Sequence, residues 1–388
     1  MRLRRCAMVT IEPRESLEFD LGRLLGGDDG LYMSLKWVAI APHLGKEIEL
    51  SAAEVALLGT LSPTNWVERA DLAGSHAADT LNALLEKNLL ISEGGDADVR
   101  DRLLRDTHWR STSAAMHYAS RWHAVDTEEV QKQYAETVDG DLLDQLGPAP
   151  AVVRERVAAE QRLRLPAAEP TPLDALLDGR VTCRNFETSR AIELAHFSAV
   201  LYRAFGARVV DDYAPGVQLL KKGVPSAGGL HPTEAYLLVQ RVESIEPGLY
   251  HYHPVDHALE PIRAMPAHDA RTLALQFVAA QPYFAEAQVM VVPVGRFFRN
   301  FWKYRNHAKA YRALILDVGH LSQTLYLAAT ELGLAAFITA AVNEVDIEQA
   351  FGLDPLEEGP LAVCGFGIRA KERSEVEFDP LNKVWKAG

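Results

Sequence analysis

The hydrophobic pattern of residues 171–388 alternates between helical and strand-like segments. Residues 306–333 repeat apolar side chains at steps of three and four, which predicts the longest helix of the chain. A second amphipathic helix is predicted over IELAHFSAVLYRAFGAR and should end at Gly206. Four apolar, β-branched runs predict strands of a sheet covered on both faces: AYLLVQRVE, QVMVVPVG, AAFITAAV and LAVCGFGI. This pattern predicts an α+β domain.

The first hundred residues have a different pattern, which predicts a separate small domain over residues 1–100. Ser51 is placed to cap a helix with Glu54 three residues later, a capping box, and an apolar face follows. Three helices and then a strand ending at Gly94 are typical of a winged helix-turn-helix. Residues 101–170 are predicted to be a helical bridge or linker, because Pro- and Ala-rich stretches occur within them and at their end.

The charge balance narrows the choice of partners. The 388 residues carry a formal net charge of −13, so we expect neither a nucleic-acid partner nor an anionic membrane surface. The winged-helix-like domain is therefore expected to pack or to dock a peptide rather than bind DNA. Three scattered cysteines indicate a reducing, cytoplasmic setting, and no cluster has the spacing of a metal site. No apolar run is long enough for a membrane span.

Two polar and small-residue stretches carry candidate chemistry. In GRVTCRNF, Arg180 and Arg184 would be neighbours if the stretch begins a helix, with the Thr182 hydroxyl between them. Two guanidinium groups, a hydroxyl and free helix-end amides would form a phosphate site. A run of almost no side-chain bulk precedes the strand AYLLVQRVE and would let backbone approach a flat ring closely. Its residues are Pro225, Ser226, Ala227 and Gly228. The alternatives are a solvated arginine face and an ordinary tight loop.

Together with GLYHYHPVDHAL, WKYRNHAKAYRALILDVGHLSQTLYLAATELGL and FITAAVNEVDIEQAFGLD, these two stretches resemble the FMN-dependent nitroreductase superfamily. The branch most similar is the SagB-type dehydrogenases of thiazole- and oxazole-forming peptide maturation. The resemblance covers residues 171–369 and implies a nitroreductase-like fold: a central mixed or antiparallel sheet flanked by helices in an intertwined homodimer. It implies FMN, with Arg180, Thr182 and Arg184 at the phosphate and ribityl chain. Residues Pro225 to Gly228 would lie against the flavin ring, and Thr339, Ala340 and Ala341 near it.

The resemblance also implies a catalytic pair at Lys303 and Tyr304. Oxidising an azoline ring removes a proton from one carbon and a hydride from its neighbour, so the protein must supply a base. Lys303 would serve if desolvation lowered its pKa, with Tyr304 positioning it or relaying the proton. The other interpretation of the pair is a cationic, aromatic patch beside the long helix. His231, next to the small-residue run, is a candidate for contact with substrate.

Three functions remain open on the sequence. The first is an FMN-dependent oxidase that converts azolines to azoles in a ribosomally made peptide, with oxygen as the electron acceptor and a cyclodehydratase as a possible partner. The second is an NAD(P)H-dependent reductase of nitroaromatics, quinones or dehydroamino acids. The third is a non-catalytic peptide-binding subunit of a modification complex. The peptide, the ring heteroatom and the true electron acceptor are not set by the sequence, nor is the role of the N-terminal domain.

Overall fold

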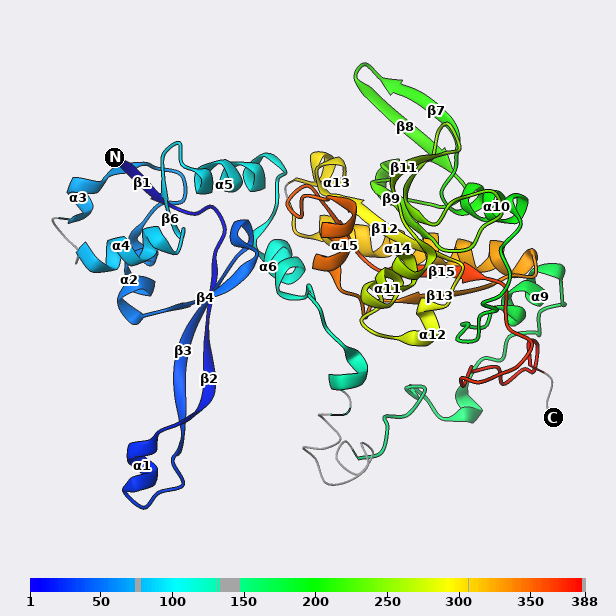
Figure 1. Cartoon of the computed structure of the whole chain (residues 1–388), viewed down its shortest axis with the longest axis horizontal. Helices are drawn as coiled ribbons and strands as arrows, with labels where there is room; N and C mark the ends of the chain where they lie inside the picture. Colours follow the sequence, from blue (N-terminus) through cyan, green and yellow to red (C-terminus); the bar gives the residue numbers. More distant parts are fainter. Residues whose placement is uncertain (74–77, 131, 133–146, 306, 386–388) are drawn as a thin grey trace.

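The computed structural model describes residues 1–73, 78–130, 132, 147–305 and 307–385. Two bodies lie side by side, an N-terminal one and a larger C-terminal one built around a sheet (Figure 1). Each has its own buried apolar cluster, and a third cluster lies between them. The domain limits of 1–100, 101–170 and 171–388 stay our proposal.

The N-terminal body is a small three-stranded antiparallel sheet covered by helices. Strand β1 (Arg2–Arg5) lies between β5 (Val67–Glu68) and β6 (Leu90–Ser92). The helices are α2 (Ala52–Thr60), α3 (Arg69–Ala73) and α4 (Ala78–Glu86). The predicted order of three helices and a strand is confirmed. So is the capping box, since the Glu54 amide donates to the Ser51 hydroxyl and the Ser51 amide donates to the Glu54 carboxylate.

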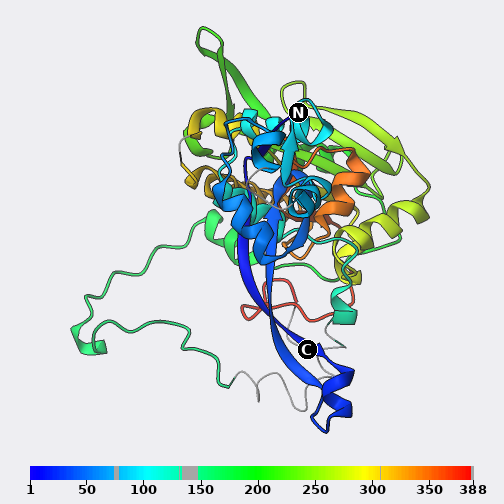
Figure 2. The ribbon, with the colours of Figure 1, turned by 90° about the vertical axis from the view of Figure 1, so that its left-hand side faces the viewer.

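A long ribbon between β1 and α2 was not predicted. Strands β2 (Thr10–Phe19), β3 (Leu31–Ala41) and β4 (Lys46–Leu50) pair antiparallel, with α1 (Leu21–Leu25) at the tip and the 3-10 turn η1 (Pro42–Leu44) before β4. The ribbon points away from both bodies (Figures 1 and 2). One face carries polar contacts such as the pair Lys36–Glu18 at 2.7 Å. The other exposes large apolar side chains, namely Leu17, Phe19, Leu31, Met33 and Leu35.

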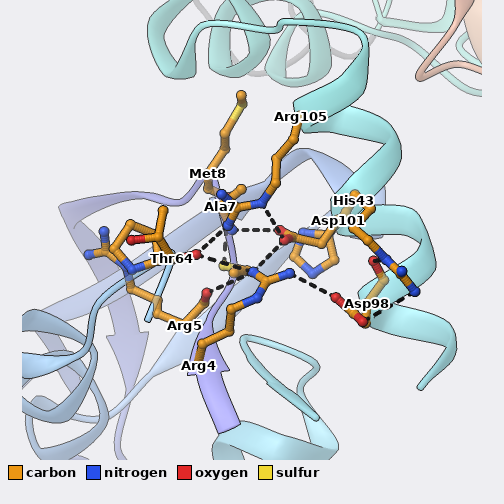
Figure 3. Close-up of polar contacts among 12 residues, drawn as sticks. Arg4, Arg5, Ala7, Met8, His43, Thr64, Asp98, Asp101 and Arg105 are labelled. Atoms are coloured by element: carbon orange, nitrogen blue, oxygen red, sulfur yellow. Dashed lines mark hydrogen bonds and ion pairs between the residues drawn. The ribbon is translucent and has the colours of Figure 1, made fainter. Parts of the chain in front are cut away.

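A buried ionic network fastens helix α5 (Asp96–Asp106) to the N-terminal sheet (Figure 3). The Arg4 guanidinium, on β1, donates to Asp98 at 2.8 Å and to Asp101 at 2.5 Å. Asp101 also accepts from the Ala7 amide at 2.5 Å and from Arg105 at 3.2 Å. These groups are almost fully buried, and buried charges are tolerated when each has a partner of this kind. Helix α5 therefore belongs structurally with the N-terminal body.

Residues just after α5 form the contact between the two bodies. Trp109 is buried against Phe297 and Phe301 of helix α13 (Phe297–Tyr304), and its indole N–H donates to the Leu356 carbonyl at 2.9 Å. Helix α6 (Ser111–Ala119) packs in the same cluster. The aromatic side chains thus tie the bridge to the helix that carries Lys303 and Tyr304. Residues 147–171, including the 3-10 turn η2 (Ala159–Gln161), run away from the bodies (Figure 2).

The C-terminal body is built on one antiparallel sheet. Its strand order is β11–β10–β9–β12–β15–β13, and β14 pairs with β12 beside this path. The four strands predicted from apolar runs are confirmed as β9, β12, β13 and β15. The bounds are β9 (Thr233–Val239), β10 (Gly248–His253), β11 (Ala258–Ala264), β12 (Val289–Arg296), β13 (Ala335–Thr339), β14 (Glu358–Pro360) and β15 (Val363–Gly367).

Helices cover both faces of this sheet, as the apolar strands predicted. Leu237 and Val239 of β9 face α10 (Leu194–Ala204) and α14 (Lys309–Glu331), whereas Leu238 faces the other side. That second face is covered by α11 (Ala267–Phe277), α12 (Pro282–Ala285) and α15 (Glu344–Phe351). Helix α9 (Pro172–Gly179) precedes the candidate phosphate segment and contacts α14. The α+β fold class is confirmed.

A second ribbon, also not predicted, rises from the C-terminal body. Strands β7 (Ala207–Ala214) and β8 (Val217–Lys222) pair only with each other, and Figure 1 shows them pointing away from the sheet. The chain then enters the small-residue loop, which contains the 3-10 turn η3 (Ala227–Gly229). Across the described ranges, every helix is too short or too polar to cross a membrane.

Candidate functional site

A buried carboxylate on the long helix holds the small-residue loop. The Ser226 hydroxyl donates to Asp317 at 2.5 Å, and the Ala227 amide donates to the other carboxylate oxygen at 3.2 Å. The Ser226 hydroxyl also accepts from the His231 amide at 3.0 Å. Asp317 lies on α14 and is only 4% exposed. Hydrogen bonds to a buried charged group are among the stronger ones, so the loop is fixed to the helix.

Gly228 is required at its position for two reasons. Its φ of +61° lies in the left-handed region that residues with a Cβ avoid. A Cβ there would also lie 2.6 Å from both the Lys303 Nζ and the Tyr304 hydroxyl. The Lys303 ammonium donates to the Gly228 carbonyl at 3.3 Å. The missing side chain therefore lets the loop meet the predicted catalytic pair.

Lys303 and Tyr304 end helix α13 and lie beside an apolar cavity. The cavity has a volume of about 380 Å³, and its lining includes Leu219, Leu230 and Trp302 together with Lys303. Lys303 itself is exposed to solvent. The sequence analysis required the Lys303 amine to be shielded from water, and this chain alone does not shield it.

The segment carrying Arg180, Thr182 and Arg184 is extended, so the expected helix start is wrong. Thr182 forms a parallel bridge with Ala336 of β13, which adds this segment to the edge of the sheet. Alternation along an extended chain places Arg180 and Thr182 near Tyr326 of α14, whereas the Arg184 guanidinium lies 5.6 Å from the ring centre of Tyr283 on α12. Pairing of Thr182 with β13 thus fixes this segment as extended backbone, in place of the helix start that the arginine spacing suggested.

Arg180 and Thr182 meet a tyrosine of the long helix. The Thr182 hydroxyl lies 3.0 Å from the Tyr326 hydroxyl, and the Arg180 guanidinium lies 5.2 Å from the centre of the Tyr326 ring. Burial raises the pKa of Tyr326, so its hydroxyl stays protonated. Within the described residues, the Arg180 guanidinium forms no hydrogen bond or ion pair, and its amide donates to the Leu177 carbonyl at 3.4 Å. A hydroxyl pair and an unpaired guanidinium are a donor set suited to a phosphate.

Arg184 is engaged by the C-terminal tail of its own chain. Its guanidinium donates to the Val376 carbonyl at 3.0 Å, and its amide donates to Glu377 at 2.7 Å. Glu377 also pairs with Arg369, which follows β15. The tail around these residues is therefore folded against its own chain. In the described part of the chain, the Arg180 guanidinium has no such contact, so Arg184 is the arginine of the expected phosphate site whose donors are already partly engaged.

Thr339 is the last residue of β13, the strand that Thr182 joins, and Ala340 and Ala341 follow it. The Ala341 amide donates to the Thr339 hydroxyl at 3.1 Å, and the buried Gln281 amide group donates to the Ala341 carbonyl at 3.0 Å. Ala340 is exposed. This turn is held in place by hydrogen bonds and lies on the same sheet edge as the Arg180 segment.

The expected site residues thus form two groups, and each group is held by a residue of helix α14. Asp317 holds the loop of Pro225 to Gly228, and Tyr326 holds Arg180 and Thr182. The two helix positions are nine residues apart, which is about 13.5 Å along the axis and half a turn around it. The two groups differ in what they offer: the Arg180 group has donors suited to a phosphate, and at Gly228 the space that a Cβ would take is filled by Lys303 and Tyr304. The two groups face opposite sides of the helix within one chain.

His231 lies on a different side of the loop from Lys303. It lines a separate cavity, and its φ of +44° is also left-handed. Burial, together with nearby lysine and arginine charges, lowers its pKa to about 4. The imidazole is therefore neutral at neutral pH. In the part of the chain that the structure describes, no three His, Cys, Asp or Glu side chains are placed to hold a metal ion.

Sequence reasoning missed Asp317 and Tyr326. Both lie among apolar residues of a helix predicted for its apolar face, and both are buried. The signal available was Asp317, a carboxylate inside the run ALILDVGHL, because buried carboxylates are rare without a partner. Tyr326 gave no such signal, since tyrosine is common on packed helix faces.

The fold of the C-terminal body agrees with the family comparison. Residues 177–368 match the model of the nitroreductase family. These residues form a nitroreductase-family domain, and the family is one of flavin-binding oxidoreductases.

Two curated relatives extend the comparison. The trifolitoxin-processing protein TfxB of Rhizobium leguminosarum bv. trifolii is 28% identical over 258 residues, 61% of this chain and 64% of its own length. The microcin B17-processing protein McbC of Escherichia coli is 26% identical over 196 residues, 47% of this chain and 65% of its own length. The chain thus spans just under two thirds of each relative.

A solved structure of the E. coli microcin synthetase McbBCD complex with truncated pro-MccB17 bound is 20% identical, with a TM-score of 0.49. The match covers 69% of this chain and 98% of that chain.

Proposed function

We propose that this protein is an FMN-dependent oxidoreductase of ribosomal peptide maturation that oxidises azoline rings to azoles. The observation that carries the proposal is the meeting of Lys303 and Tyr304 with the side-chain-free Gly228 in a nitroreductase-family domain. Support for a peptide substrate comes from the two relatives, which are processing proteins for trifolitoxin and microcin B17.

The proposed cofactor contacts follow from the two residue groups. Arg180, Thr182 and Arg184 would hold the phosphate, with Arg184 depending on release of its contact with Val376. The Pro225 to Gly228 backbone would lie against the ring, fixed by Asp317, and the Thr339 to Ala341 turn would lie near it. When bound, FMN supplies an acceptor for the hydride.

The proposed base is Lys303. To accept the ring proton its amine must be neutral, and it must face the substrate carbon. The Gly228 carbonyl accepts a hydrogen bond from its Nζ and thereby orients the side chain, while Tyr304 lies beside it to position it or relay the proton. Because Lys303 is exposed in the single chain, exclusion of water must come from the bound peptide or from a second subunit.

We propose a homodimer on the basis of the same geometry. One FMN molecule that contacts both groups cannot do so on opposite sides of α14 in one chain. Two copies would bring the Gly228 group of one chain to the Arg180 group of the other. Exposed apolar side chains on α14, Ile315 and Leu316, are available for such a contact. A cyclodehydratase partner is proposed to supply the azoline, and the N-terminal body is the part free to dock it or a leader peptide.

The test is oxidation of an azoline-containing peptide by the purified chain supplied with FMN. We expect loss of two hydrogens per ring by mass spectrometry, and at least a hundredfold slower reaction for Lys303→Ala. Lys309→Ala is the matched control, because Lys309 is also an exposed lysine nearby but is not at the Gly228 carbonyl. Protein with bound FMN that leaves every azoline peptide unchanged contradicts the proposal. Rapid bleaching of the flavin absorbance by NADH or NADPH would instead identify a reductase.

A further inference from the structure

A second cavity, of about 450 Å³, lies between the β7–β8 ribbon and the body of the C-terminal sheet. It is on the His231 side of the small-residue loop, and Leu230 contributes to both this cavity and the one beside Lys303. Charged side chains from four segments line it: Lys222, Glu234, Arg296 and Arg299. None of these residues was a candidate in the sequence.

Lys222 is the unusual member of this set. It is 3% exposed, and across the described parts of the chain its ammonium group has neither a hydrogen bond nor an ion pair. Burial lowers its pKa to about 8, with partial compensation from the charge of Glu234. The group is therefore still charged at neutral pH. A buried charge without a partner is costly, so the cavity is suited to an anion that this chain does not itself provide.

The carboxylate already in the cavity is not that partner. One oxygen of Glu234 accepts from Arg296 at 2.8 Å, and the other lies 3.1 Å from His251. Burial raises the pKa of Glu234, but these two hydrogen bonds more than offset it and bring the pKa below its usual value. Glu234 is thus ionised and occupied elsewhere, and Lys222 remains unpaired.

The other charges make the cavity cationic. Arg299 donates to the carbonyls of Leu230 at 3.1 Å and Gln218 at 2.7 Å, so it is fixed in place without neutralising its charge. Lys222, Arg296 and Arg299 together face the single carboxylate of Glu234. In a chain with a net charge of −13, this local excess of positive charge is the reverse of the average surface.

A groove connects this cavity to the proposed catalytic pair. A third cavity, of about 480 Å³, shares Arg296 and Arg299 with it. The same cavity shares Val217 and Trp302 with the one beside Lys303. Glu357 and Glu358 also line this third cavity, which forms the middle of the groove. The excess positive charge is therefore confined to the end of the groove at Lys222. Such a groove fits an extended chain that carries a negative charge at one end.

We propose that this groove binds the peptide substrate and that the Lys222 cavity receives a carboxylate of it, either an acidic side chain or the C-terminus. The proposal rests on the proposed function in taking the ligand to be a peptide. It adds a specificity site, since peptides with a carboxylate at this distance from the reacting ring would be held in register with Lys303.

Binding is tested on the full-length protein by isothermal titration calorimetry. Three short Gly/Ser/Ala peptides serve as probes: one with a single Asp and an amidated C-terminus, the same peptide with Asn in place of Asp, and a neutral one with a free C-terminus. The variants are Lys222→Met and, as a matched control, Lys221→Met, because Lys221 is the neighbouring lysine but is exposed. Inorganic phosphate is titrated separately and as a competitor.

We expect Lys222→Met to weaken binding of a carboxylate-bearing peptide by about tenfold or more, and Lys221→Met to change it by no more than about twofold. Which of the two carboxylate peptides binds identifies the source of the negative charge. The proposal is overturned if the Asp and Asn peptides bind equally and the peptide with a free C-terminus binds no more tightly than they do. It is also overturned if Lys222→Met and Lys221→Met weaken binding equally. Phosphate that binds Lys222 more tightly than any peptide carboxylate overturns it too.

The calorimetric measurement of peptide binding requires neither bound FMN nor catalytic turnover. A protein that binds acidic peptides through Lys222 but oxidises no azoline would refute the proposed function and leave the carboxylate site standing. A protein that oxidises azolines at the same rate with Asp and Asn peptides, and binds both equally, would refute the carboxylate site alone.

Discussion

Gly228 is the residue on which the geometry of the catalytic pair most depends. We predict that Gly228→Ala lowers azoline oxidation at least tenfold, because the new Cβ would displace Lys303 and Tyr304 and the backbone would be strained by about 1–2 kcal/mol. Gly352→Ala is the control, since Gly352 has a similar φ of +73° with nothing within 4 Å of the added Cβ. Equal losses in the two variants would mean that backbone strain, rather than the contact with the pair, is responsible.

Lys222 gives a prediction about stability and pH. Its pKa of about 8 lies below the usual value of 10.5, so the folded protein binds this proton more weakly than the unfolded chain does. The charged group therefore costs about 3 kcal/mol below pH 8, and the cost disappears as the pH rises toward 10.5. Glu234, His231, Arg296 and Arg299 line the same cavity as this group.

We accordingly expect Lys222→Met to raise the melting temperature at pH 7, with the difference from wild type shrinking between pH 8 and pH 10 in thermal scans. A variant that is less stable than wild type at pH 7 would show that Lys222 has a stabilising partner after all.

Residue-level prediction from the sequence was uneven for a physical reason. The small-residue run was recognisable because loss of side-chain bulk is visible in the sequence itself. Arg180, Thr182 and Arg184 were selected on a helical spacing that the structure replaces with strand alternation. Asp317 and Lys222 were not found, because their importance comes from burial and from partners far away in the sequence.

At the scale of elements, helix α14 is the part that organises the site. Asp317 on this helix fixes the Ser226–Ala227 backbone. We predict that Asp317→Ala lowers the fraction of protein carrying FMN and the rate of oxidation by about tenfold or more, because a hydrogen bond to a charged group contributes about 1.5–3 kcal/mol.

The conservative variant Asp317→Asn should recover part of this loss, since an amide oxygen can still accept from the Ala227 amide. Flavin absorbance of the purified variants gives the FMN content, and urea unfolding reports whether the fold itself is weakened. Loss of stability without loss of FMN would assign Asp317 a structural role only.

The elements that the sequence predicted best are the buried ones. Strands β9, β12, β13 and β15 and helix α14 have long apolar patterns because neighbours cover them on several sides. The β2–β3 and β7–β8 ribbons were missed because they alternate or mix polar and apolar residues and are stabilised mainly by strand pairing, with Ala39 and Ala41 at the base of β3 joining the N-terminal core.

At the scale of the whole molecule, we propose that a second copy completes the site, because the two residue groups lie on opposite sides of α14. Leu316 of α14 is 60% exposed and lies next to Asp317. We predict that Leu316→Glu converts a dimer to a monomer in light scattering and releases FMN, because a buried charge would disrupt an apolar contact. Leu17→Glu on the β2–β3 ribbon is the control, since Leu17 is 63% exposed. A wild-type monomer that keeps its FMN would contradict the two-chain site.

This arrangement could not be read from the sequence alone. Apolar periodicity indicates that a helix face is covered but does not distinguish cover by the same chain from cover by another. Four strands of the sheet were predicted from their apolar runs, but their order across the sheet was not, because that order and the placement of the two residue groups about α14 depend on the three-dimensional path of the chain.

The central claim is that a nitroreductase-family domain with these two residue groups holds one FMN per chain. The most direct measurement is the visible spectrum of the purified full-length protein, followed by release and chromatographic identification of the bound chromophore. The account predicts a yellow protein whose chromophore is FMN, and a strong loss of it in Arg180→Ala. A colourless protein that cannot be reconstituted with added FMN would contradict the account.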